Sequence, residues 1–238
     1  MQRLALSVAL GLATLSVLPP VARAAETAPA LDAPRPAKTG FQAHFFSGVA
    51  LPAGRATGAA GDTLAKRYAW QIPFGVDLGG KLTRSTYLGG YLIIGVGSEG
   101  SDRLVEALCD DDDEDWENDV SCSAVNVRLG IEAEYGFDPG GYVSPWLGYG
   151  FGMEAGVQSI RDSTGYRENN TATGITWAQL SGGLDVRNAV GWGPFAELSL
   201  GRYMTTRTEV GGQHSTTDID DRAFHVWATL GMRLVVRP

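Results

Sequence analysis

The stretch NVRLGIEAEYGF, residues Asn126–Phe137, contains two sets of alternate residues of opposite character. Because successive side chains of a β-strand point to opposite faces, one face of this segment is apolar and the other is polar, charged or glycine. The apolar set is Val127, Leu129, Ile131, Ala133, Tyr135 and Phe137. The segment is therefore predicted to be a strand, and the fold depends on which of its two faces meets water.

Similar segments recur along the 238-residue chain, which is 44% hydrophobic and can therefore bury a substantial core. Each segment is long enough for the 9 to 11 residues that a tilted strand needs to cross a bilayer. We predict eight strands, at residues 41–52, 68–80, 86–98, 123–137, 142–158, 174–188, 192–206 and 223–236.

The connections between these strands alternate in length. GKLTRS, DPGG and NAVG are short, whereas the four other connections are long and polar. Outer-membrane barrels have short periplasmic turns and longer external loops, whereas a soluble meander has no reason to sort its loops to opposite ends. The pattern favours a barrel whose apolar face meets lipid and whose charged face lines the interior.

The predicted inward face is charged. Its candidates are Arg128, Glu132, Glu134, Glu154, Asp185 and Glu197. A soluble periplasmic barrel that binds an apolar ligand is an alternative interpretation, but it would need an apolar lumen. Counting residues from the short-turn ends places Glu132, Glu197 and Arg233 in one layer, so we expect an interior ion cluster there with Glu197 paired to Arg233.

The first residues indicate export. Residues 1–24 combine a basic start, an apolar run too short to span a bilayer, and a small-residue cleavage site, which together are typical of a signal peptide. Residues 25–39 are rich in Pro and Ala and are predicted to form a periplasmic tether. Residues 40–238 are then predicted to form the barrel, located in the outer membrane.

From about residue 40 to its end, the chain resembles the small eight-stranded outer-membrane barrels of Gram-negative bacteria, of the OmpA and OmpX type. The resemblance implies an all-β, antiparallel, up-and-down transmembrane barrel of the cell envelope. It also implies a structural or surface-interaction role, with membrane lipids and lipopolysaccharide as partners and a monomer as the expected state. Eight strands leave an interior that side chains can fill, so we expect a plugged lumen.

The acidic segment CDDDDEDWENDVSC is bounded by the two cysteines of the chain, Cys109 and Cys122. An exported protein meets an oxidising compartment, so we predict a disulfide between them. The segment lacks the glycine and terminal glutamate of an EF-hand loop, and we expect no more than weak association of divalent cations with it. The weak candidate ligands are Asp110, Asp111, Asp112, Asp113 and Asp115.

An enzyme is the second functional hypothesis, because some small outer-membrane barrels modify lipid A as acyltransferases or deacylases with His, Ser and an acid. The available histidines are His44, His214 and His225. His214 precedes Ser215, but an adjacent pair in a loop lacks the fixed geometry that a nucleophile requires. We therefore predict no catalytic residue and no cofactor. The net charge of −8 and the absence of a phosphate-binding loop oppose nucleic-acid binding.

Overall fold

The computed structural model describes residues 39–59, 61–100, 121–161, 166–186, 190–219 and 223–237. The predicted signal peptide, most of the predicted tether, Cys109 and the acidic residues after it lie outside these ranges. The elements are β1 (Gly40–Gly54), α1 (Leu64–Arg67), β2 (Tyr68–Lys81), β3 (Thr86–Glu99), β4 (Ser121–Gly136), β5 (Val143–Arg161), β6 (Arg167–Val186), β7 (Val190–Val210), β8 (Gln213–Asp218) and β9 (His225–Val236).

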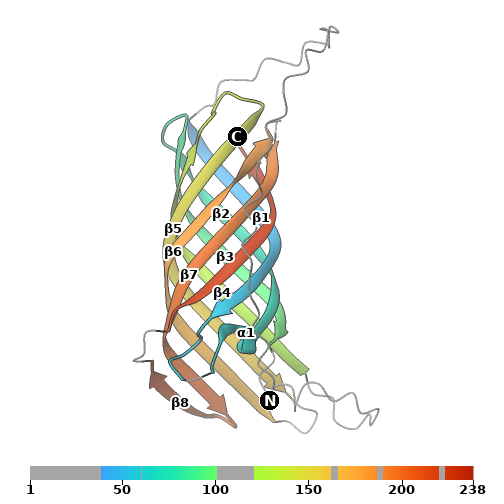
Figure 1. Cartoon of the computed structure of the whole chain (residues 1–238), viewed down its shortest axis with the longest axis vertical. Helices are drawn as coiled ribbons and strands as arrows, with labels where there is room; N and C mark the ends of the chain where they lie inside the picture. Colours follow the sequence, from blue (N-terminus) through green and yellow to red (C-terminus); the bar gives the residue numbers. More distant parts are fainter. Residues whose placement is uncertain are drawn as a thin grey trace, which may run out of the picture. The chain divides into compact units, whose positions relative to one another are not determined.

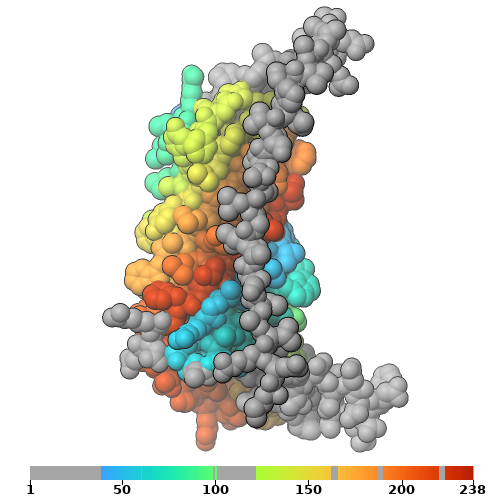
Figure 2. All heavy atoms as spheres, viewed as in Figure 1, coloured from blue at the N-terminus to red at the C-terminus, as the bar shows by residue number. Residues whose placement is uncertain are grey.

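Eight of the described strands close into an antiparallel barrel, as the sequence predicted (Figure 1). Neighbouring strands in the chain pair in order from β1 to β7, β7 then pairs with β9, and β9 returns to β1. The closing register runs from Ala43 opposite Val236 to Gly54 opposite His225. β1 and β9 also lie side by side in the space-filling view, as blue and red surfaces (Figure 2). The closed ring therefore has no free edge along its length.

The outer face of the barrel is apolar. On β7, Trp192, Leu198 and Met204 are exposed, whereas Glu197 and Ser199 between them are buried. β9 continues the pattern, because Leu230 is 70% exposed and its successive outward neighbours are Met232 and Leu234. A surface that exposes large apolar residues on every strand of the ring is stable against lipid and not against water. This arrangement is the reverse of a soluble ligand-binding barrel, so that alternative does not fit.

Two strands, β6 and β7, extend furthest beyond their predicted ends. β6 begins at Arg167, seven residues before the predicted start, and β7 continues to Val210 and turns into β8. Gly211 and Gly212 join β7 to β8 as a two-residue hairpin turn, and both have positive φ angles, 58° and 83°. Paired glycines with positive φ suit the tight turns that match strand twist. The segments predicted as long loops here are instead largely hairpin.

The two ends of the barrel differ. β2 and β3 are joined by residues 82–85, and β4 and β5 by residues 137–142, where the Asp138 carboxylate accepts hydrogen bonds from the Gly140 and Gly141 amides. These short turns lie at the same end as the C-terminus, while β8 and α1 lie at the opposite end (Figure 1). Within the described residues, no helix is long and apolar enough to cross a membrane.

Candidate functional site: the polar lumen

The lumen is lined by side chains that are both buried and polar. They come from every strand of the ring except β3, whose buried inward side chains are Tyr87, Tyr91 and Ile93. The buried polar set includes Gln42, His44, Gln71, Asp77, Asn126, Arg128, Glu132, Glu134, Glu154, Gln179, Asp185, Glu197, Ser199, His225, Thr229 and Arg233. Burying so many charges is costly unless they pair, and the pairing divides the lumen into layers.

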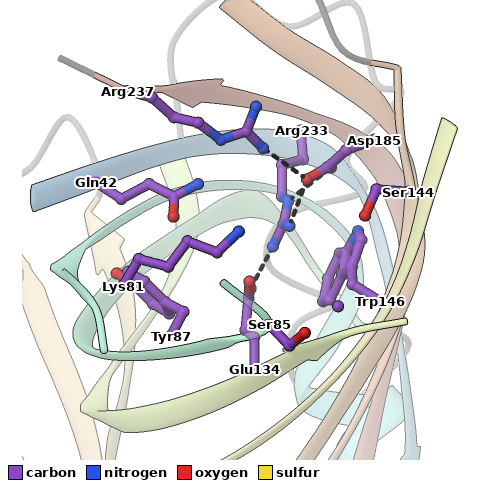
Figure 3. Close-up of a pocket in the computed structure, with 11 residues that line it drawn as sticks. Gln42, Lys81, Ser85, Tyr87, Glu134, Ser144, Trp146, Asp185, Arg233 and Arg237 are labelled. Carbon is purple, nitrogen blue, oxygen red and sulfur yellow. Dashed lines mark hydrogen bonds and ion pairs between the residues drawn. The ribbon is translucent and has the colours of Figure 1, made fainter. Parts of the chain in front are cut away.

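The layer nearest the short turns is organised by Arg233 of β9. Its guanidinium donates to Glu134 and to both oxygens of Asp185, at 3.1 and 3.3 Å, and it lies 3.5 Å above the ring centre of Trp146 (Figure 3). Arg237 also reaches Asp185, at 3.4 Å. A cavity of about 30 Å³ lies beside this layer, which is room for about one water molecule.

The middle layer pairs Arg128 of β4 with Glu197 of β7. The two side chains lie 2.8 Å apart across the lumen, and Arg128 also donates to the Ser199 hydroxyl. The second oxygen of Glu197 accepts a hydrogen bond from Gln179 at 3.0 Å. This carboxylate is therefore satisfied on both oxygens.

The layer nearest the long connections surrounds Glu154 of β5. Its carboxylate accepts hydrogen bonds from Asn126 at 2.9 Å, Trp227 at 2.9 Å and Tyr203 at 3.2 Å. His225 lies 3.0 Å from its other oxygen. Four partners on one carboxylate make a structural hub, because little of its hydrogen-bonding capacity is left for a reacting group.

Beyond this layer, an apolar cluster covers the end of the lumen. Leu64 of α1 is fully buried against Tyr68, Tyr203 and Trp227. The backbone carbonyl of Arg67 accepts a hydrogen bond from Gln158 of β5 at 2.8 Å, which ties the short helix to the opposite wall. The connection between β1 and β2 therefore folds into the barrel mouth.

A salt bridge outside the spanning region fixes this connection. Arg67 donates two hydrogen bonds to Asp62, at 2.8 and 3.1 Å, and Thr57 donates a third. Burial raises the pKa of Asp62, but the hydrogen bonds from Arg67 and Thr57 outweigh burial and hold the pKa below its ordinary value. Asp62 is therefore ionised at neutral pH and orients α1.

The predicted ion cluster needs a correction. Glu132, Glu197 and Arg233 are all buried in the lumen, but Arg233 pairs with Glu134 and Asp185, and Glu197 pairs with Arg128. The register explains the difference, because Arg233 lies opposite Gly193 while Glu197 lies opposite Thr229. Arg233 therefore lies four residues along β9 from Thr229, the partner of Glu197, which is about 13 Å of strand at 3.3 Å per residue.

Counting residues from the predicted turns failed because Val190, two residues before the predicted start of β7, pairs with Val236, so Glu197 lies seven residues from this end of the strand pair and Arg233 lies three. Sequence reasoning also did not anticipate that His44 and Asp77 join Glu132 and Glu134. The sequence did show that His44 and Asp77 are polar residues in strands of alternating apolar and polar character. Their direct pairing, however, depends on the register between β1 and β2.

The remaining predicted positions fall elsewhere. Cys122 lies at the start of β4, but Cys109 and Asp110 to Asp115 lie outside the described residues, so the disulfide and the acidic cation site stay predictions. His214 and Ser215 lie on β8, where they are exposed and successive in the strand. Their side chains therefore point to opposite faces.

A closed antiparallel ring with an apolar exterior and an ion-paired interior defines an eight-stranded membrane-spanning β-barrel of the outer-membrane type. No family model matches the chain, and no curated protein matches it.

Solved structures of outer-membrane proteins are similar to it. A major outer membrane protein from Thermus thermophilus is 13% identical with a TM-score of 0.48, over 83% of this chain and 99% of that one. The attachment invasion locus protein Ail of Yersinia pestis is 12% identical with a TM-score of 0.48, over 82% and 99%. Neisserial surface protein A is 14% identical with a TM-score of 0.41, over 82% and 97%.

Proposed function

We propose that this chain is an outer-membrane barrel with a plugged lumen and a structural or surface-interaction role, and that it is neither a pore nor an enzyme. The observation that carries the proposal is the paired interior. Arg233, Arg128 and Glu154 each centre a layer of contacts, and the cavity beside the Arg233 layer measures about 30 Å³. A hydrated ion needs a continuous path through all three layers.

The apolar cluster over the last layer supports the same proposal. Leu64 and Trp227 are almost completely buried, so water has little room between α1 and the barrel wall. The Arg67 and Asp62 pair holds α1 in position. Passage of a solute would require this connection to unfold locally.

The external extensions supply the surface on which the proposed role depends. On β7 the continuous exposed apolar series ends near Met204, and Thr206, Arg207 and Glu209 follow it before Val210 at the end of the strand. β8 is exposed along its whole length and pairs with β7 on one side only. These residues extend past the apolar band, into the region of lipopolysaccharide head groups. We propose those lipids as partners, together with divalent cations at the acidic segment.

The arrangement of histidines argues against lipid A chemistry. His44 and His225 are fully buried inside the lumen, where a lipid outside the barrel cannot reach them. His214 cannot share a proton with Ser215, because the two side chains leave opposite faces of β8. Nucleophile activation requires the base within hydrogen-bond reach.

Conductance in planar bilayers tests the proposal. The folded protein should show no stable open channel, while a water-filled porin incorporated into the same bilayers should conduct. The porin shows that the assay can detect an open barrel. A steady conductance from the unmodified protein would refute the plugged lumen.

A further inference from the structure

Four potential metal ligands meet inside the lumen. His44 of β1 lies directly opposite Asp77 of β2, and Glu132 and Glu134 lie two residues apart on the inward face of β4. One ligand atom from each lies within 4.8 Å of those of the others. All four residues are buried.

The strand between these ligands places an aromatic ring beside them. On β3, Gly89 lies opposite Glu132 and contributes no side chain to the lumen. A Cβ atom at Gly89 would meet the Tyr87 hydroxyl and would lie 2.9 Å from the Leu78 carbonyl oxygen. The glycine therefore allows Tyr87 to lie across the sheet and pack on His44, with ring centroids 4.5 Å apart.

His44 is the observation that separates this group from an ordinary set of buried acids. Its side chain is fully buried, and neither ring nitrogen has a hydrogen-bond partner in the described part of the chain. Its Nδ1 lies 3.5 Å from Asp77 and 3.6 Å from Glu134, so the nitrogen faces the carboxylates but is beyond hydrogen-bond distance. Within the same described ranges, one oxygen each of Asp77 and Glu132 also lacks a partner.

The spacing suits an ion between the ligands. Metal–ligand bonds of about 2.0 to 2.1 Å in a tetrahedral zinc site put neighbouring ligand atoms about 3.3 Å apart. The two distances from His44 Nδ1, 3.5 and 3.6 Å, are slightly longer than that edge. A cavity of about 10 Å³ adjoins Asp77, Glu132 and Glu134 on the lumen side. Closing the ligands onto an ion requires movements of a few tenths of an ångström along these two edges and of up to about 1.5 Å along the others, which are no longer than 4.8 Å.

The charge of the group also calls for a cation. Three buried carboxylates lie together, and the Arg233 guanidinium that contacts Glu134 also contacts Asp185. Arg237 also contacts Asp185, so two arginines serve Glu134 and Asp185, while Asp77 and Glu132 lie together beside them. Buried charges without compensation are strongly destabilising, and a divalent ion supplies two positive charges at the centre of the group.

We propose that His44, Asp77, Glu132 and Glu134 form a binding site for a divalent transition-metal ion, with Zn²⁺ as the best match. One imidazole and three carboxylates make a nitrogen and oxygen donor set, whereas Ca²⁺ and Mg²⁺ favour oxygen ligands alone. Arg233 orients Glu134 from the outer shell, as such partners commonly do. The ion enters from the short-turn end, where the cavity lined by Tyr87 and Glu134 lies (Figure 3).

The test measures Zn²⁺ binding to the full chain. The protein is stripped of metal with a chelator, folded in detergent and then incubated with Zn²⁺. The folded protein should retain one equivalent of Zn²⁺ per chain after gel filtration, as counted by elemental analysis. His44→Gln and Glu132→Gln should each weaken the affinity at least tenfold, because each removes a ligand. Glu197→Gln removes an equally buried carboxylate outside the group and should leave Zn²⁺ affinity unchanged.

A second control separates this site from the acidic segment. A variant with Asn at Asp110, Asp111, Asp112 and Asp113 should bind Zn²⁺ as the unmodified protein does. Co²⁺ provides a readout that needs no variant, since a tetrahedral site gives much stronger visible absorption than hydrated Co²⁺. The proposal is wrong if folded protein retains no Zn²⁺, if His44→Gln binds it equally well, or if the acidic-segment variant loses it.

Discussion

Replacement of Arg233 by Met should destabilise the barrel by about 3 to 5 kcal/mol, the usual cost of removing one partner of a buried ion pair. Arg233 is 5% exposed, and it neutralises both Glu134 and Asp185. Met conserves much of the side-chain volume but leaves both carboxylates without their main cation. Arg233→Lys should cost less, about 1 to 2 kcal/mol, because it keeps the charge and loses the two-pronged contact with Asp185 and the packing on Trp146.

The assay is equilibrium unfolding by urea in lipid vesicles without added metal, followed by tryptophan fluorescence. Arg207→Met is the matched control, because Arg207 is an exposed arginine on the outer part of β7, where substitutions usually change stability by less than about 0.5 kcal/mol. Adding Glu134→Gln and Asp185→Asn to Arg233→Met should recover part of the loss, since it removes the stranded charges. An Arg233→Met protein as stable as the unmodified one would refute the reasoning.

Two further predictions concern the external end. The ion pair of Asp62 should stabilise α1 fully above the ordinary Asp pKa of about 3.9, and this contribution should disappear as pH falls through the lowered pKa of the folded state. Asp62→Asn should show no such change. Hydrogen exchange of amides 62–68 measures the effect, and pH-independent protection in the unmodified protein would contradict it. Cys109 and Cys122 should give no free thiol under denaturing, non-reducing conditions. Replacing both with Ser should leave the barrel assembled, because the cross-link closes a connection between strands and not the ring itself. Two free thiols, or loss of all folded protein in the variant, would contradict this prediction.

The sequence predicted the ring because a membrane imposes a simple rule on every strand. The outward series on β4, from Val127 to Phe137, had to be apolar to meet lipid. The alternation alone therefore identified the segment as a strand and showed which of its residues face outward. Outside the lipid the rule no longer applies. Residues 167–173 and Gln213–Asp218 are polar on both faces, and for that reason they were predicted as loops although they continue the sheet.

Pairing inside the lumen was less predictable for a different reason. Which inward side chains meet depends on the offset between strands that are distant in the sequence, and a shift of four residues moved Arg233 from Glu197 to Asp185. The meeting of His44 with Glu134 involves β1 and β4, whose relative heights follow from the accumulated register of all the strands between them. The pattern within one strand does not specify this accumulated offset between strands.

Cell fractionation followed by gel migration with and without heating tests the central claim, that the chain forms a closed barrel in the outer membrane. The protein should be found with the outer membrane, should require detergent for extraction, and should migrate differently when unheated because a closed sheet resists unfolding by detergent. Recovery as a periplasmic monomer without detergent, with the same migration before and after heating, would contradict the account.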